Sequence, residues 1–335
     1  MHMADALLSP AVGGAMWAVS AGATVYATKK ITDMDLSQKK LPVMAVAGAF
    51  VFAAQMINFT IPGTGSSGHI CGGIMLAALL GELPAFLTLA SVLIIQCLFF
   101  ADGGLLALGA NIFNMGFIPC LIMYPLIFRP LMKKGISKAK LAGASILCCV
   151  LGLQLGAFGV VLETLASGIT ELPFGTFVAM MQPIHLAIGF VEGLITAAVV
   201  VFVWQVRPEL VESSVHKEKV SENLSLGKVT VIFAVLSAVV AGGLSLLASA
   251  FPDGLEWSME KVAGTTELEA SGGVYGFVEK IQNTLSFMPD YDFAAGTGSG
   301  TSVAGIVGAL LTCALALLTG FIITQMKKKN VDGGH

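Results

Sequence analysis

The sequence predicts an all-α integral membrane protein, a polytopic bundle of about nine helices of which one is short. Of the 335 residues, 56% are hydrophobic and only 12% are charged, and the mean hydropathy is +0.85. A water-soluble domain of this length needs far less apolar surface for its core, so the surplus must face lipid. The charged residues also fall in the breaks between long apolar stretches. Together these observations exclude a water-soluble fold.

The predicted helices are nine apolar stretches, most of them near the roughly 20 residues that a membrane-spanning helix requires. In order they cover residues 10–28, 41–61, 70–81, 84–100, 105–128, 140–163, 180–204, 228–249 and 303–325. The third is too short to cross a bilayer alone, and it lies between a glycine-rich stretch and Glu82-Leu83-Pro84. We therefore expect a partial helix that protein shields from lipid.

Basic residues form four clusters between the predicted helices. They are Lys29, Lys30, Lys39 and Lys40; Arg129, Lys133, Lys134, Lys138 and Lys140; Arg207, Lys217, Lys219 and Lys228; and Lys327, Lys328 and Lys329. Passing the nine helices alternately through the membrane puts all four clusters on one side, which the positive-inside rule makes cytoplasmic. The same threading puts the C-terminus in the cytoplasm. It places the N-terminus, the loops at 63–72, 102–104 and 167–174, and the segment 251–300 outside.

The chain divides near residue 206. Residues 1–206 hold about seven of the helices, and residues 207–227 form a polar linker on the predicted cytoplasmic side. Residues 228–335 hold the last two helices, which a long outer segment joins, so we expect them to form a transmembrane hairpin. No internal repeat relates the two parts.

Two histidines, His2 and His69, fall on the predicted outer side and together indicate a metal site. The α-amino group of Met1, the backbone nitrogen of His2 and its imidazole can close fused chelate rings around one ion, and His69 is the natural fourth donor. Square-planar nitrogen sites favour nickel(II) or copper(II). Affinity should fall steeply in acid, because the imidazoles must be neutral and the amide must lose its proton. The alternatives are a frayed terminus for His2 and a loop or helix-cap role for His69.

Four further residues are candidates for orienting a ligand or lining the path of the ion: Asp102, Asn111, His185 and Glu192. His185 and Glu192 lie in the seventh predicted helix, two turns apart and close to one face, and ionisable residues inside a membrane are functional candidates. For His185 and Asn111 the alternative is a hydrogen bond between helices. Asp102, at the outer end of the fourth helix, either orients a ligating imidazole or forms a simple turn.

Two common catalytic motifs are missing from the sequence. It has no Gly-x-x-x-x-Gly-Lys-Ser/Thr phosphate loop, since Gly227-Lys228 lacks both the upstream glycine and the following hydroxyl residue, and it has no His-Glu-x-x-His. Any transport driven by ATP therefore needs a partner chain that carries the nucleotide site.

Several motifs together resemble the M-type substrate-binding components of energy-coupling-factor cobalt and nickel transporters, the CbiM/NikM family. The similar residues are Met1-His2 with Leu7-Leu8-Ser9-Pro10, Ser67-Gly68-His69, Asp102-Gly103-Gly104-Leu105 with Leu108-Gly109-Ala110-Asn111, and His185 with Gly189, Glu192 and Leu194-Ile195-Thr196. The second part contains Pro252-Asp253-Gly254-Leu255-Glu256, which resembles the signature of the small N-type component of the same transporters. The chain thus looks like a fusion of an M-type and an N-type component.

This resemblance implies a site, a substrate and partners. The site would consist of the Met1 amine, the His2 backbone nitrogen and imidazole, and the His69 imidazole, with Ni²⁺ or Co²⁺ as the transported substrate. The implied partners are a membrane T-type coupling subunit and cytoplasmic ATPase subunits; the chain would lie in the bilayer of the cell membrane, and no nucleic acid is expected. The family commonly has an acidic residue and a glycine shortly after its start, and Met3-Ala4-Asp5-Ala6 lacks the glycine, which bears on how the N-terminal loop folds back.

Two other classes of function compete with metal capture. A membrane metal sensor or metalloenzyme could use the same site, but a catalytic ion needs an open position and a nearby general base, and the outer loops show no such arrangement. A self-sufficient secondary transporter would have intramembrane acidic residues and repeated halves with broken helices. Only Glu192 and the short third helix support this class. The sequence favours a transport subunit that is not itself an enzyme, and it leaves the choice between nickel and cobalt open.

Overall fold

Helices dominate the computed structural model, which describes residues 1–31, 36, 39–221, 225–293 and 300–332. All nine predicted helices are present, and the all-α membrane fold is confirmed. In order they are α1 (Pro10–Lys30), α2 (Lys40–Gln55), α3 (Gly73–Leu80), α4 (Glu82–Phe100), the continuous segment Leu108–Lys133, α7 (Lys138–Ser167), α8 (Phe174–Val206), α10 (Gly227–Gly242) and α13 (Thr301–Asp332). The side chains of the last basic cluster, Lys327 to Lys329, lie outside the described part.

The fifth predicted helix is continuous but changes its winding. It begins as α5 (Leu108–Asn111), continues as the π-helix η2 (Ile112–Phe128) and ends as α6 (Arg129–Lys133). Pro119 and Pro125 lie inside the π-helical part. Proline has no N–H to donate and clashes with the preceding turn of an α-helix, so the wider turn accommodates both rings.

Among the described residues, five helical segments are long and apolar enough to cross a membrane: α4, Leu108–Lys133, α7, α8 and Thr301–Met326. All eight residues of α3 are buried, so the short third helix is shielded by protein, as predicted. The outer faces of α7 and α8 expose large apolar side chains, which suits contact with lipid. They include Leu147, Leu155, Leu162, Leu186, Phe190 and Leu194.

Several helix ends differ from the prediction: the fifth and ninth helices run on to Lys133 and Asp332, beyond the predicted 128 and 325, and three other ends differ as follows. The second stretch was predicted to be helical to residue 61, but α2 ends at Gln55 and a β-hairpin follows. α10 ends at Gly242, before the predicted 249, and is followed by the short 3-10 helix η3 (Leu244–Leu247). α8 begins at Phe174 rather than near residue 180. Apolar composition marks a membrane segment but not the residue where a helix stops, because strands and short helices are equally apolar.

The hairpin positions His69. Strand β1 (Phe59–Ile61) pairs antiparallel with β2 (Ser66–Gly68). Gly63 and Gly65 have φ angles of 78° and 73°, which glycine adopts without steric cost, so the chain reverses tightly between the strands. His69 is the first residue after β2 and is therefore held at a fixed place.

Three more helices lie in segments predicted as connections. α9 (Pro208–His216) lies in the linker, and α11 (Gly254–Ala263) and α12 (Gly273–Leu285) lie in the outer segment of the second part. The apolar face of α9 is buried, and the Ser214 hydroxyl donates to the carbonyl of Ala78 in α3 at 2.6 Å. The linker is thus packed against the bundle instead of being only a polar connection.

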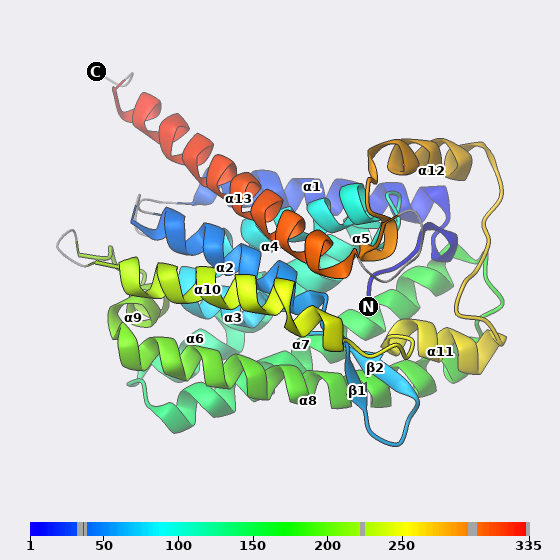
Figure 1. Ribbon diagram of the computed structural model, residues 1–335, viewed down its shortest axis with the longest axis horizontal. Helices are drawn as coiled ribbons and strands as arrows, with labels where there is room; N and C mark the ends of the chain where they lie inside the picture. The colour runs from blue at the N-terminus through cyan, green and yellow to red at the C-terminus, as the bar shows by residue number, and fades with distance from the viewer. Residues whose placement is uncertain (32–35, 37–38, 222–224, 294–299, 333–335) are drawn as a thin grey trace.

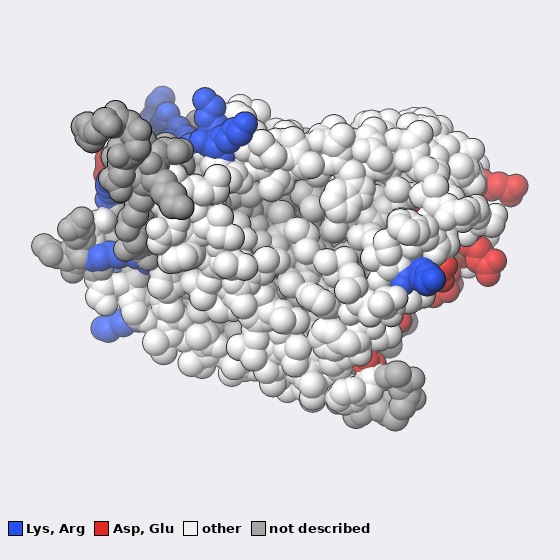
Figure 2. All heavy atoms as spheres, turned by 90° about the horizontal axis from the view of Figure 1, so that it is seen from above, with Lys and Arg blue, Asp and Glu red and all other residues white. Residues whose placement is uncertain are grey.

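The helices run side by side along one axis, so the molecule has two distinct ends (Figure 1). The hairpin, α11 and α12 lie toward one end, while α9 and the C-terminal end of α13 lie at the other. Figure 2 shows Lys and Arg side chains mostly at this second end and Asp and Glu side chains mostly at the first, with a broad uncharged girdle between them. This is the separation of charge that the threading through the membrane predicts.

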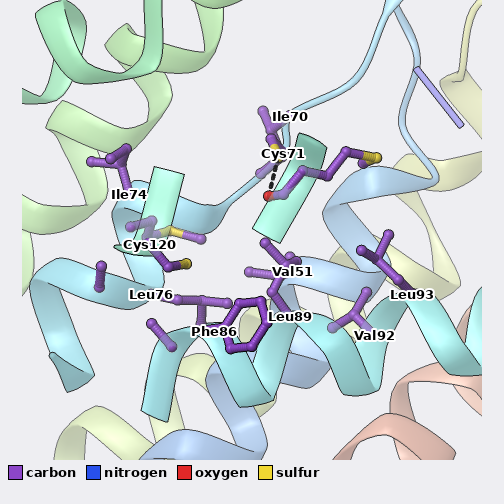
Figure 3. Packing of buried hydrophobic residues seen from close by; sticks show 14 of the residues in the cluster. Val51, Ile70, Cys71, Ile74, Leu76, Phe86, Leu89, Val92, Leu93 and Cys120 are labelled. Carbon is purple, nitrogen blue, oxygen red and sulfur yellow. Dashed lines mark hydrogen bonds between the residues drawn. The ribbon is translucent and has the colours of Figure 1, made fainter. Parts of the chain in front are cut away.

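The apolar centre of the bundle joins both parts of the chain. Figure 3 shows Val51 of α2, Ile74 of α3 and Leu89 of α4 among its buried side chains. The Cys71 thiol donates to the Met115 carbonyl there, at 3.0 Å. All six cysteines are free. Because α10 and α13 pack against α2, the second part of the chain belongs to the same bundle.

Candidate metal site

The N-terminal segment is folded back against the bundle and is not frayed. Met1 is only 8% exposed. The Asn111 side chain accepts a hydrogen bond from the Met3 N–H at 2.8 Å and donates one to the Met3 carbonyl at 3.2 Å. The Asp5 carboxylate accepts one from the Ala107 N–H at 2.9 Å. Asn111, predicted as a path residue or as a hydrogen bond between helices, thus holds the backbone of the N-terminus.

The Met1 amine and the His69 imidazole face each other. The amine nitrogen lies 2.9 Å from Nε2 of His69. Nδ1 of the same ring lies 3.0 Å from the carbonyl oxygen of Ile70, which can only accept, so Nδ1 carries the hydrogen and Nε2 keeps its lone pair. Burial, and next the charge of the amine, lower the pKa of His69 to about 3. A neutral imidazole with a fixed tautomer is the form that binds a metal ion.

His2 lies beside His69. The centroids of the two rings are 5.1 Å apart and their planes differ by 19°. Nδ1 of His2 lies 3.1 Å from Oδ1 of Asp102, and Nε2 lies 3.2 Å from the side-chain amide of Gln96. Burial lowers the pKa of His2 to about 3, and the nearby amine acts in the same direction. Both imidazoles are therefore neutral near pH 7.

Asp102 links His2 to the second part of the chain. Its Oδ2 accepts a hydrogen bond from the Tyr291 hydroxyl at 2.5 Å, while Oδ1 faces His2. Burial raises the pKa of Asp102, and the bond from Tyr291 acts against this effect. The residue also lies in a turn, since its neighbours Ala101 and Gly103 both have positive φ. The turn and the contact with an imidazole, offered as alternatives by the sequence, occur together.

The motif at 252–256 begins a helix and reaches the N-terminus. Asp253 caps α11, since its Oδ1 accepts from the N–H groups of Leu255 at 2.7 Å and Glu256 at 3.0 Å. Glu256 completes a capping box by accepting from the Asp253 N–H at 2.9 Å. The other oxygen, Oδ2, pairs with the Met1 amine at 2.5 Å. Burial raises the pKa of Asp253, but the charge of the Met1 amine and its direct contact with the carboxylate outweigh this effect and hold the pKa well below its usual range.

The same motif is docked on the hairpin that carries His69. The Ser67 N–H donates to the Pro252 carbonyl at 2.8 Å. Gly254 packs against α8, where a Cβ would lie 2.8 Å from Cδ1 of Ile188 and 3.0 Å from Cε1 of His185. A side chain at this position would have to displace Ile188 and His185 or push α11 away from α8, so the close approach favours glycine.

His185 and Glu192 of α8 bond to backbone groups near the site. Nδ1 of His185 donates to the Met181 carbonyl at 2.8 Å, and Oε1 of Glu192 accepts from the Gly72 N–H at 2.9 Å. Within the described part of the chain, Nε2 of His185 has no hydrogen-bond partner, and His185 lines a small cavity together with His69. His185 thus lines a cavity next to the predicted ligand His69. Glu192 instead holds the residue that precedes α3.

Sequence reasoning missed three contacts to the predicted ligands. Gln96 and Tyr291 were not singled out, and Asp253 was noted only as part of a motif. The Asp-x-x-Glu spacing of 252–256 does signal a capped helix, but nothing local indicates the contact with Met1. Among the described residues there is no group of three or more His, Cys, Asp or Glu side chains that could hold a metal. The predicted site needs none, because two of its four nitrogens belong to the main chain.

Two families of known proteins match the chain, one for each part. Residues 2–210 match the CbiM family, described as a cobalt uptake substrate-specific transmembrane region. Residues 227–325 match the PDGLE domain.

Relatives of about 31% identity extend over most of the chain. The putative fused nickel transport protein NikMN of Archaeoglobus fulgidus is 31% identical, over 97% of this chain and 98% of its own length. The probable fused nickel transport protein LarMN of Lactiplantibacillus plantarum is 31% identical, over 78% and 79%. A solved structure of a truncated transition metal transporter is 31% identical, with a TM-score of 0.54 over 61% of this chain and 99% of its own. The chain is therefore a membrane transport component and not an enzyme, and it belongs to the CbiM family, with a PDGLE domain fused to it.

Proposed function

We propose that this protein is the substrate-binding component of an energy-coupling-factor importer that captures Ni²⁺ or Co²⁺ at Met1, His2 and His69. The two relatives named above are described as a putative and a probable fused nickel transport protein, and the cobalt transport protein CbiM of Geobacter sulfurreducens is 29% identical over 78% of this chain. The observation that carries the proposal is the distance of 2.9 Å between the Met1 amine and Nε2 of His69.

This distance suits two ligands of one ion. Metal–imidazole bonds are about 2.0 Å long, so two nitrogen ligands at right angles lie roughly 2.8 Å apart. The backbone nitrogen of His2 directly follows the amine in the chain, so these two nitrogens can close a five-membered chelate ring. Three of the four donors are thus near their places before the ion arrives.

The fourth donor, the imidazole of His2, has to turn for binding. Its Nδ1 faces Asp102 at 3.1 Å, whereas a second chelate ring with the His2 backbone nitrogen needs Nδ1 on the ion. When the ion binds, Nδ1 of His2 therefore leaves Asp102 and contacts the ion instead. Four nitrogens in one plane favour nickel(II), while the cobalt-transporting relative keeps cobalt within the proposal.

The charge distribution supports an outward-facing site in the cell membrane. Basic side chains gather at the end opposite the β-hairpin (Figure 2). By the positive-inside rule that end is cytoplasmic. The N-terminus then lies outside and the C-terminus inside. Residues 1–206 form the M-type domain, 207–227 the cytoplasmic linker and 228–335 the N-type hairpin.

Delivery of the ion across the membrane is assigned to partner chains. The sequence has no phosphate loop, so a T-type membrane subunit and cytoplasmic ATPases would supply the energy, as in energy-coupling-factor importers. A membrane metal sensor is the alternative with the same site, and the transport function of the relatives favours the importer.

Metal titration with ligand variants tests the capture site. The purified protein, with its native N-terminus, should bind about one nickel or cobalt ion per chain in calorimetry, and His2→Ala and His69→Ala should abolish tight binding. His216→Ala is the matched control, because His216 ends α9 far from the hairpin and should leave binding unchanged. Full binding by both ligand variants would refute the site.

A transport assay tests the coupling separately. Cells that make this chain together with a T-type subunit and ATPases should accumulate radioactive nickel, and cells that make the chain alone should not. Equal accumulation in both would favour a self-sufficient transporter.

A further inference from the structure

Asp253 is the point where the second part of the chain touches the N-terminus. Its side chain is 14% exposed and that of Met1 is 7% exposed, so the ion pair between them is largely removed from water. The two carboxylate oxygens have separate tasks: Oδ1 caps α11, and Oδ2 contacts the Met1 amine at 2.5 Å. The cap therefore fixes the direction in which the free oxygen points.

The place of Asp253 is also fixed relative to the loop of His69. The Ser67 hydroxyl donates to the Phe251 carbonyl at 2.7 Å, and the indole N–H of Trp257 donates to the Thr64 carbonyl at 3.0 Å. These bonds lie on either side of Asp253 in the chain. The hairpin and the start of α11 thus form one unit, which presents a carboxylate and an imidazole to the same amine.

The charge of Asp253 suits both the empty and the loaded site. In the empty site the carboxylate balances the Met1 ammonium. In the loaded site a divalent ion and one deprotonated backbone amide leave one positive charge, and the same carboxylate balances it. A buried charge that loses its partner is strongly unfavourable, and a neutral side chain would also no longer hold the amine against His69, so such a side chain should weaken metal binding.

We propose that Asp253 is a positioning residue of the metal site, which holds the Met1 amine against His69 and balances the charge of the bound ion. This inference rests on the proposed function and extends it, because it makes capture a joint property of both parts of the chain. The PDGLE domain then contributes a residue to the site itself, in addition to any role in assembling the transporter.

Neutral variants that keep the helix cap test this proposal. Asn and Ser cap helices about as well as Asp, so Asp253→Asn and Asp253→Ser remove the charge and leave α11 in place. We expect both to weaken nickel binding about 10- to 100-fold, the range for residues that orient metal ligands. At saturation the visible spectrum should match that of the wild type, because the four nitrogen donors are unchanged.

Glu256→Gln is the matched control. It removes a neighbouring negative charge at the same helix end, keeps the capping box because Gln accepts the same hydrogen bond, and does not touch the amine, so its nickel affinity should stay close to that of the wild type. If Asp253→Asn and Asp253→Ser bind nickel as tightly as the wild type, the proposal is wrong. If Glu256→Gln weakens binding as much as they do, the effect belongs to negative charge at this helix end in general and not to Asp253, and the proposal is equally overturned.

The wild type and His69→Ala, titrated alongside, separate this proposal from the proposed function. A wild type that binds no metal, or a His69→Ala variant that binds normally, overturns the capture site itself. Binding by the wild type, its loss in His69→Ala and normal affinity in both neutral Asp253 variants overturn only the role of Asp253.

Discussion

Single residues fix the nitrogen donors of the proposed site before an ion arrives. The Ile70 carbonyl sets the tautomer of His69, and Asn111 holds the backbone of Met3 by two hydrogen bonds. The fold-back of the N-terminus, left less certain by the missing glycine, is thus achieved by an asparagine more than a hundred residues away. Such supporting residues commonly matter nearly as much as the ligands they hold.

Asn111→Ala removes both hydrogen bonds to the Met3 backbone. We expect nickel affinity, measured by calorimetry, to fall about 10- to 100-fold because the amine loses its fixed position. Gln154→Ala is the control, since Gln154 also bonds a backbone carbonyl, that of Gln182, at 2.8 Å, but contacts no predicted ligand. Unchanged affinity in Asn111→Ala would show that the two hydrogen bonds from Asn111 to Met3 are not needed for metal binding.

The buried imidazoles predict how stability depends on pH. Burial lowers the pKa of His2 and of His69 from 6.5 to about 3, so between these values the unfolded chain binds protons that the folded chain does not. The free energy of unfolding of the metal-free protein should fall as the pH drops from 6.5 towards 3, by about 1.4 kcal/mol per pH unit for each ring. In chemical unfolding His69→Gln should show a shallower slope; a slope equal to that of the wild type would contradict a neutral, buried His69.

Two small elements, the β-hairpin and α11, bring the two parts of the chain together at the N-terminus. The hairpin leads directly into His69, and Asp253 is the residue that caps the start of α11. The approach of α11 to α8 depends on Gly254, because a Cβ there would lie 2.8 Å from Ile188 and 3.0 Å from His185. The glycine of the 252–256 motif is thus explained by packing, and the aspartate by capping and charge.

Gly254→Ala should displace α11 from α8. We expect a loss of about 1–3 kcal/mol in the free energy of unfolding, typical of an overpacked contact, together with weaker nickel binding. Gly273→Ala is the control, because Gly273 begins α12 and a Cβ added there would meet no other atom within 4 Å. Thermal unfolding in detergent compares the two, and equal stability of both variants would contradict the packing argument.

The sequence predicted the helices better than the elements around the site. Long apolar stretches identified all nine helices, since burial in lipid leaves a strong local signal. The hairpin, the docking of α11 against the site and the burial of α9 depend on contacts between distant segments, which have no local signal. The same holds for residues: chelate chemistry pointed to His2 and His69, but the contacts of Asp253 and Tyr291 arise from packing across about 190 residues or more.

The whole molecule is polarised, with a basic end, an uncharged girdle and an acidic end (Figure 2). The girdle is the surface that a bilayer would cover, and the proposed site lies toward the acidic end with the hairpin and α11. Because both parts of the chain share one apolar core around α2, the PDGLE domain is built into the bundle. Orientation in the membrane thus decides from which side the ion enters.

Labelling of introduced cysteines tests this orientation. Glu171→Cys lies in the loop before α8 at the predicted outer end, and Lys134→Cys lies after α6 at the basic end; both positions are exposed. A thiol reagent that cannot cross membranes should label Glu171→Cys in intact cells and Lys134→Cys only after lysis. The native protein serves as background, since five of its six cysteines are buried. The reverse pattern would place the N-terminus in the cytoplasm.

The most direct test of the central claim uses the amine itself. Three residues, Gly-Ser-Gly, placed before Met1 move the α-amino group away from His2 while leaving His2, His69 and Asp253 unchanged; a single added residue would make histidine the third residue, and such a terminus chelates nickel by itself. If the Met1 amine is a ligand, the native protein should bind about one nickel ion with the visible spectrum of a square-planar nitrogen site, and the extended protein should lose both the affinity and the spectrum. If the extended protein binds nickel like the native one, the amine is not a ligand, and the account of this site is wrong.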